Sequence, residues 1–207
     1  MRVPAVAVSA DDIKKLRAST GAGIMDCRKA LEDGGGSIEK AIALLREQGA
    51  AKALAKEGRK AEEGIVMAYV HHGGKLGSLI ELNCETDFVA RNEEFVTLAR
   101  ELAMQVAATS PKYVTREEVP ADVLEVQRAE ARQQAATLGR DPEGHVKEKL
   151  DQFISNACLM EQPYIRDAAV TVQSLITEKV AKFGERMRVK RFVVFKLGED
   201  LEEGESR

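Results

Sequence analysis

Three short runs of helical periodicity occupy the start of the chain, and glycine follows each of them. In each run apolar residues recur every three or four positions, the spacing that places them on one face of a helix. Ser9-Ala10-Asp11-Asp12 has the form of a capping box, Gly21-Ala22-Gly23 separates the first two runs, and Ser37 is a suitable N-cap for the third. We expect these helices to end at Gly21, at Gly34-Gly35-Gly36 and at Gly49, and to form a minimal bundle.

The pattern changes after the third run. Residues 50–63 are rich in Ala, Lys and Glu, which favour helices, and contain Leu54 as their one large apolar residue. This composition predicts an exposed helical linker. Residues 65–72 and 75–84 then have the composition of strands, and Gly73-Gly74 between them is typical of a two-residue type I′ turn. We therefore expect an antiparallel β-hairpin.

Helical periodicity returns after the β-hairpin. One helix is expected to begin after Asn92, and two more, at roughly 121–138 and 145–159, to form a helical hairpin around turn-forming residues. A last helix ends at Gly184, and residues 187–197 form a strand rich in Val and Phe. Because two strands alone are marginally stable in water, this strand is expected to join the β-hairpin.

The predicted fold class is therefore α+β. It comprises a three-helix module (residues 1–49), a helical linker (50–63) and a core (64–198) with a three-stranded antiparallel sheet, covering helices and a helical hairpin at about 121–159. Residues 199–207 form an acidic tail that we expect to be frayed.

Composition favours a protein partner. The 207 residues contain 31 Lys and Arg against 34 Asp and Glu, so there is no excess of positive charge to attract nucleic acid or anionic lipid. Aromatic residues make up 4% and Trp is absent, which leaves few stacking platforms for single-stranded nucleic acid. We expect neither direct nucleic-acid binding nor membrane binding.

The cysteines and the N-terminus indicate the compartment. Cys27, Cys84 and Cys158 are odd in number, far apart and outside any Cys-x-x-Cys pair, which argues against disulfides and against a zinc site. The N-terminal apolar run is too short for a signal peptide, and no run reaches the ~18 apolar residues of a membrane span. We expect a soluble cytoplasmic protein.

No catalytic motif is present in the sequence. A Gly-x-x-x-x-Gly-Lys-Ser/Thr phosphate-binding loop is missing, so the chain is not expected to be a GTPase itself. His71 and His72 are adjacent in a predicted strand and would point to opposite faces, which does not suit one metal ion. We expect no enzyme activity, no metal and no cofactor, and rank a small hydrolase using His72 and Cys84 far below a binding protein.

Two features are candidate contact sites. Thr86-Asp87-Phe88 lies where a strand meets a helix, so Phe88 is either a wedge presented to a partner or a core residue beside a turn-capping Asp87. The second feature is Met25 with Arg17. Met25 lies on the polar side of its helix, away from the apolar face that Ile24 is expected to share, so it is either a contact residue or an ordinary exposed methionine.

Three segments together resemble one family. Residues 15–31 read KLRASTGAGIMDCRKAL, residues 83–92 read NCETDFVARN and residues 103–108 read AMQVAA. The first two closely resemble the signatures of elongation factor Ts, in the same order along the chain, and the third also matches. The resemblance extends over nearly the whole chain, to the end of the last predicted strand.

The resemblance implies a fold and a function. It implies an N-terminal three-helix (UBA-like) module that docks on the GTPase elongation factor Tu, a core that presents an Asp-Phe wedge, and a helical arm. The chain would then be a guanine-nucleotide exchange factor that promotes GDP release without catalysing a reaction. Longer members have two core subdomains where this chain has one, so the resemblance implies a homodimer in a two-to-two complex.

The resemblance also implies roles for individual residues. Arg17, Ile24 and Met25 would help to dock the module. Asp87 and Phe88, preceded by Thr86 in the same signature, would enter the GTPase near its magnesium site. A histidine of the longer members contacts the partner, and either His71 or His72 matches it, with His72 directly before Gly73-Gly74.

One further alternative remains at this stage. A generic three-helix binding module, attached to an unrelated α+β core, has the same small helical bundle as its support. The two long signatures favour the exchange factor.

Overall fold

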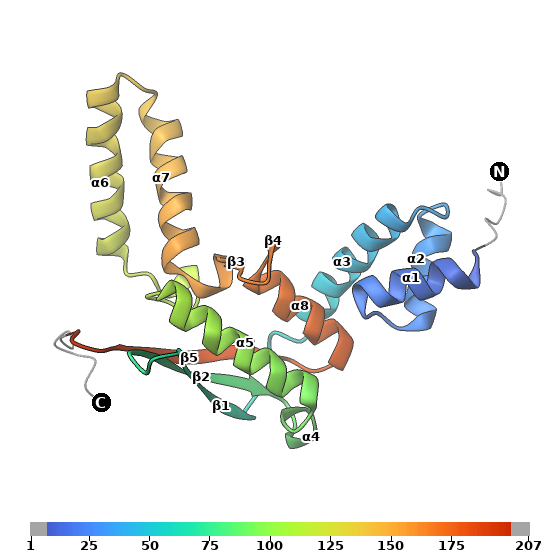
Figure 1. Ribbon diagram of the computed structural model, residues 1–207. Helices are drawn as coiled ribbons and strands as arrows, with labels where there is room; N and C mark the ends of the chain where they lie inside the picture. Colours follow the sequence, from blue (N-terminus) through green and yellow to red (C-terminus); the bar gives the residue numbers. More distant parts are fainter. Residues whose placement is uncertain (1–7, 200–207) are drawn as a thin grey trace.

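The computed structural model describes residues 8–199 and has the predicted α+β architecture (Figure 1). Its elements, in chain order, are α1 (Ala10–Thr20), α2 (Ile24–Asp33), α3 (Ile38–Leu54), β1 (Glu63–Val70), β2 (Leu76–Cys84), α4 (Asp87–Ala90), α5 (Glu93–Thr109), a 3-10 turn (Arg116–Glu118), α6 (Ala121–Leu138), α7 (Pro142–Ala157), a second 3-10 turn (Leu159–Glu161), β3 (Pro163–Tyr164), β4 (Asp167–Thr171), α8 (Val172–Phe183) and β5 (Arg188–Lys196). The predicted acidic tail lies outside the described residues except for its first residue, Glu199.

The N-terminal module is the predicted three-helix bundle, formed by α1, α2 and α3. The Ser9 side chain accepts a hydrogen bond from the Asp12 amide at 3.0 Å, so the predicted N-cap of α1 is confirmed. Gly21 ends α1 in the left-handed conformation with φ 65°. Leu16, Cys27 and Leu31 are completely buried between the three helices, and this small apolar core holds the module together.

The third helix is longer than predicted. It does not stop at Gly49 but continues to Leu54, so residues 50–54 belong to α3 and do not start a separate helix. A Cβ atom at Gly49 would lie 3.5 Å from the Cβ of Ala181 on α8, so this buried glycine packs one helix against another. Residues 55–58 form turns, and residues 59–62 lead into β1 without regular structure. A glycine that resembles a helix stop in the sequence is thus a site of helix packing.

The sheet has three antiparallel strands in the order β1-β2-β5, so the C-terminal strand joins the β-hairpin as predicted. The predicted two-residue turn at Gly73-Gly74 is wrong. The Gly74 amide donates to the His71 carbonyl at 2.9 Å, which closes the turn one residue earlier, and the His71 amide donates to the Leu76 carbonyl at 2.8 Å. His71 and His72 therefore lie in a longer loop and not in a strand.

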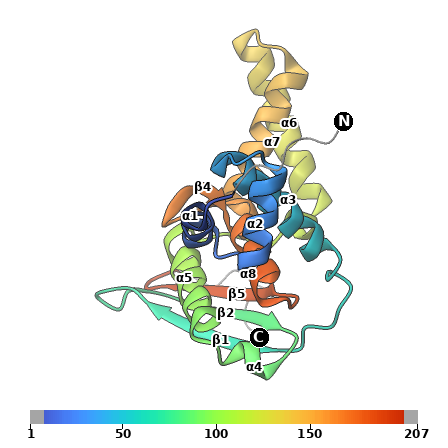
Figure 2. The ribbon, with the colours of Figure 1, turned by 90° about the vertical axis from the view of Figure 1, so that its right-hand side faces the viewer.

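Helices cover one face of this sheet, and the other face is open (Figures 1 and 2). α5 and α8 pack on the covered face, where the main core forms around Phe95, Leu82 and Ile176. Alternate residues of the strands point the other way. The exposed apolar residues of the open face are Val66, Val70, Leu79, Val193 and Phe195.

The predicted helical hairpin is an arm that projects from the core (Figure 1, left). Its second helix, α7, begins at Pro142 and not near residue 145, because Asp141 caps it by accepting a hydrogen bond from the Gly144 amide at 2.7 Å. Ala131 and Ala135 of α6 are buried, so small side chains let the two helices approach each other.

A short two-stranded sheet, β3-β4, lies at the base of the arm and was not predicted. Gln105 of α5 is fully buried beside it and donates to Gln162 at 3.0 Å and to the Pro163 carbonyl at 3.1 Å, while its amide oxygen accepts from the Ile165 amide at 2.8 Å. These bonds join α5 to the chain that returns from the arm.

Substitution of Gly64 tests the close packing of β1 against β2. Gly64 has φ 143°, and a Cβ atom there would lie 2.1 Å from the Leu82 carbonyl oxygen and 2.7 Å from the Cα of Asn83. Gly64→Ala is therefore expected to lower the free energy of unfolding by about 2–4 kcal/mol through backbone strain and displacement of β2. Gly58→Ala is the control, because nothing lies within 4 Å of that position. Denaturant midpoints compare the two variants, and equal midpoints would contradict the prediction.

Candidate protein-interaction sites

The segment Thr86, Asp87 and Phe88, called here the Asp-Phe tip, forms the start of the one-turn helix α4. Thr86 is the N-cap, and its hydroxyl accepts from the Val89 amide at 3.4 Å. The Phe88 side chain is 81% exposed, whereas Val89 and Ala90 are buried and anchor the turn. Of the two interpretations of Phe88, the core residue is therefore wrong, and an aromatic side chain stands on the surface.

Asp87 is also exposed at this tip. Its carboxylate forms an ion pair with Arg91 at 3.0 Å, one turn later, and both side chains are largely open to solvent. An ion pair this exposed contributes little to stability. The carboxylate can therefore exchange this partner for another cationic group without a large cost to the fold.

Two carboxylates that sequence reasoning missed form hydrogen bonds at the base of the tip. Glu185, between α8 and β5, accepts from the Glu85 and Thr86 amides at 3.1 Å each and from the Thr86 hydroxyl at 2.6 Å. Glu85 in turn accepts from the Arg186 amide at 2.6 Å and pairs with Arg59 at 3.3 Å, and these contacts lower the pKa of the Glu85 carboxyl. No local pattern could have revealed partners that lie a hundred residues apart.

Cys84 lies directly under the tip and is unsuited to nucleophilic chemistry. Its thiol is completely buried and donates to the Thr86 carbonyl at 3.1 Å. Burial, together with the negative charge of Glu185, raises the pKa of this thiol to about 11. His72 lies before β2 and Cys84 ends it, so the nine residues of the strand separate them by about 30 Å. The hydrolase alternative is wrong on this geometry.

The second site lies on the N-terminal module. Met25 is 72% exposed, which agrees with its predicted position on the polar side of α2. The prediction for Ile24 is wrong: it is the first residue of α2, where its side chain is 54% exposed beside Met25 and does not join the buried face. Arg17, in the last turn of α1, is exposed on the other side of the connecting turn.

The structure separates the predicted site residues into three places. Arg17, Ile24 and Met25 flank the α1–α2 turn, and the Asp-Phe tip follows β2, at α4 near the bottom of Figure 1. His72 lies in the exposed loop before β2, at the opposite end of the sheet. Arg17, Ile24 and Met25 belong to one packed unit and the tip to another, and His72 is remote from the tip.

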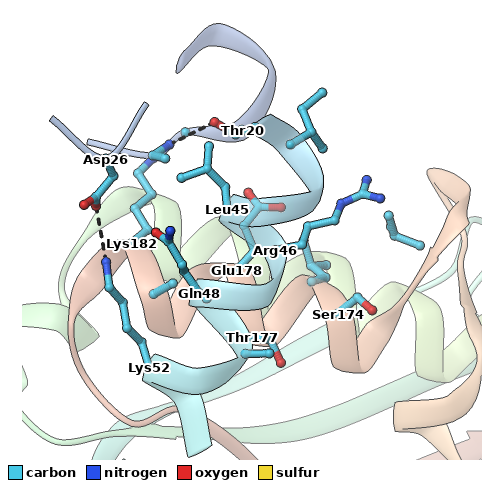
Figure 3. Close-up of a pocket in the computed structure, with 18 of the residues that line it drawn as sticks. Thr20, Asp26, Leu45, Arg46, Gln48, Lys52, Ser174, Thr177, Glu178 and Lys182 are labelled. Carbon is cyan, nitrogen blue, oxygen red and sulfur yellow. Dashed lines mark hydrogen bonds and ion pairs between the residues drawn. The ribbon is translucent and has the colours of Figure 1, made fainter. Parts of the chain in front are cut away.

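A cleft of about 860 Å³ lies between the module and α8 (Figure 3). Asp26 and Lys52 form an ion pair across part of its wall at 3.3 Å, and both belong to the module. Within residues 8–199, no hydrogen bond or ion pair joins residues 8–54 directly to residues 63–199. The linker supplies the polar connections, since Lys56 donates to the Gly184 carbonyl at 2.6 Å and Arg59 pairs with Glu85.

Other kinds of site were sought in the described part of the chain. Across residues 8–199, no group of three His, Cys, Asp or Glu side chains is arranged to hold a metal ion. None of the described helices has the length and apolar character needed to cross a membrane. The sites that stand out are exposed side chains beside buried neighbours, an arrangement typical of surfaces that bind other proteins.

Comparison with known proteins identifies the family. Residues 5–199 match the family model described as Elongation factor TS. The chain is 49% identical over 197 residues to elongation factor Ts of Carboxydothermus hydrogenoformans (94% of this chain, 91% of the relative) and 50% identical over 198 residues to that of Desulforamulus reducens (94% and 91%). It is 50% identical over 202 residues to that of Moorella thermoacetica (96% and 99%). The chain belongs to the elongation factor Ts family and is a translation elongation factor.

Proposed function

We propose that this chain is a non-enzymatic guanine-nucleotide exchange factor of the cytoplasm that binds elongation factor Tu and promotes release of its GDP. The observation that carries the proposal is the tip. Phe88 is a large aromatic side chain, 81% exposed, on a short turn whose neighbours are buried. Exposure of this apolar ring to water is unfavourable in the free protein. Burial of the ring in a partner would therefore contribute free energy to binding. Family membership supports the choice of partner.

The proposed mechanism divides the work between the two sites. Asp87 and Phe88 enter the GTPase near its magnesium ion, where a carboxylate and an aromatic ring disturb the metal and phosphate contacts. Ile24 and Met25, with the charge of Arg17, dock the module at a distance from the nucleotide. Exchange requires that binding of the factor and binding of GDP oppose each other. The proposal assigns this opposition to the contacts near the nucleotide. His72, or His71 in its place, is a further contact at the other end of the sheet.

We also propose that the protein acts as a homodimer in a two-to-two complex. A sheet face that stays in water usually carries polar residues, yet here all three strands expose apolar ones. A second copy brings the same surface to a two-fold axis, so apolar residues meet apolar residues. Glu81, bound by Lys190 at 3.1 Å and Arg191 at 2.7 Å, provides a charged border to this face.

Phe88→Ala tests the wedge. Because the side chain is exposed, its loss is expected to change the free energy of unfolding by no more than about 0.5 kcal/mol. Release of fluorescent GDP from elongation factor Tu is expected to slow by about tenfold or more, the loss typical of an interface anchor. Stopped-flow release and thermal melting measure the two effects. Unchanged release in a folded variant would remove Phe88 from the mechanism.

Met25→Ala and the double variant Asp87→Ala/Phe88→Ala separate docking from exchange. Met25→Ala is expected to weaken binding to nucleotide-free and GDP-bound elongation factor Tu by the same ratio, because docking does not depend on the nucleotide. The double variant is expected to reduce the ratio between those two affinities, since linkage makes the opposition reciprocal. Titration calorimetry on both forms gives the ratios, and an unchanged ratio in the double variant would exclude the tip as their source.

Phe195→Glu tests the dimer. A two-fold interface places the new charge in both copies. Burial of one such side chain contributes ~1.5–3 kcal/mol, so its loss is expected to raise the dissociation constant of the dimer by at least about tenfold. Val126→Glu on α6 is the control, because Val126 is also exposed, at 54% against 56% for Phe195, but lies on the arm. Sedimentation velocity gives the masses. Equal dissociation of both variants, or a monomeric parent protein, would contradict the proposal.

A further inference from the structure

We propose that Glu185 is a positioning residue that holds the Asp-Phe tip in the orientation needed for nucleotide release. The inference rests on the exchange function proposed above and assigns a role to the α8–β5 loop, which carries none of the site residues predicted from the sequence. It starts from the hydrogen bonds between Glu185 and the two residues before a one-turn helix about a hundred positions earlier in the sequence.

The Glu185 carboxylate is used on both of its oxygens. Oε2 accepts from the successive amides of Glu85 and Thr86, at 3.1 Å each, and Oε1 accepts from the Thr86 hydroxyl at 2.6 Å. Hydrogen bonds to an ionised group are stronger than those between neutral groups. The arrangement fixes the direction of the chain at the two residues that lead into the tip.

The Thr86 hydroxyl connects Glu185 to α4. The same oxygen that donates to Glu185 accepts from the Val89 amide at 3.4 Å, as the cap of the helix. A carboxylate that orients the hydroxyl therefore also orients the first turn of α4. Asp87 and Phe88 belong to that turn, so their directions depend on a residue that touches neither of them.

Core packing holds only one side of α4. The helix has four residues, and the two that are proposed to meet the GTPase are exposed. A single isolated turn is unstable in water, because few hydrogen bonds repay the ordering of its backbone. Val89 and Ala90 attach the turn to the core. The bonds to Glu185 add a polar restraint at the start of the helix, directly before Asp87 and Phe88.

The same loop also holds the linker of the docking module. The Gly184 carbonyl accepts from Lys56 at 2.6 Å, and the Arg186 side chain donates to the Arg59 carbonyl. Glu85, directly before the tip, contacts both the loop and the linker, since it accepts from the Arg186 amide and pairs with Arg59. These cationic groups also offset the repulsion between the neighbouring carboxylates of Glu85 and Glu185. One short loop thus contacts both the tip and the linker that follows the docking module.

The experiment compares Glu185→Ala and Glu185→Gln with Glu148→Gln, a control at an exposed glutamate of α7. Saturating concentrations of each variant are mixed with elongation factor Tu carrying fluorescent GDP. Glu185→Ala is expected to slow maximal GDP release by about tenfold, the order expected for loss of preorganisation at a site. Glu185→Gln retains one acceptor oxygen and is expected to fall between Glu185→Ala and the parent protein. Release with Glu148→Gln is expected to equal that of the parent.

A double-mutant cycle separates positioning from general stability. If Glu185 acts through the tip, Glu185→Ala is expected to have no further effect on release in a protein that already carries Phe88→Ala. A general loss of stability would instead multiply the two effects, and that outcome overturns the inference. The proposed function fails separately, when Phe88→Ala alone leaves release unchanged.

Hydrogen exchange provides a readout that does not depend on elongation factor Tu. The Glu85 and Thr86 amides are expected to exchange faster in Glu185→Ala than in the parent protein, while the amides of the sheet core keep their protection. Unchanged exchange at Glu85 and Thr86, or loss of protection throughout the sheet, would contradict a local positioning role.

Discussion

The antiparallel pairing of β5 with β2 is the constraint on which the rest of the structure depends. Asn83 near the end of β2 faces Arg188 at the start of β5, so the turn after one strand meets the loop before the other. This register brings Glu185 within hydrogen-bond distance of Thr86. It also completes the sheet on which α5 and α8 pack. Strand pairing, a property of the backbone, therefore determines where the Asp-Phe tip and Glu185 lie.

The N-terminal module is held in a different way. α3 packs on α8 through the small residues Gly49 and Ala181, and the polar contacts to the core belong to the linker residues Lys56 and Arg59. A cleft remains beside this contact. Close apolar packing at one point and charged contacts at another restrict the module without merging it into the main core. Such a connection agrees with the proposal that two sites contact separate parts of one partner.

Local signals in the sequence predicted the helices and strands well, because capping residues and periodicity act over a few positions. Ser9, Gly21 and Ser37 have the capping roles expected of them. Errors arose where distant packing decides, as at Gly49, which looks like a helix stop but faces another helix. For Phe88, local composition allowed a core residue and a surface wedge, and only the complete fold excludes the first. Glu185 could not be found at all, because its partners become neighbours only when the sheet closes.

The position of β5 near the end of the chain has a consequence for synthesis on the ribosome. The N-terminal bundle and the β1–β2 hairpin are built from local contacts and can form as the chain emerges, whereas β2 keeps an unpaired edge until the last strand arrives. The arm is inserted between them and delays that closure. A nascent or shortened chain that ends before residue 184 contains both family signatures but lacks the carboxylate that holds the second. If Glu185 has the proposed role, a chain can promote nucleotide release only after its final segment has been synthesised.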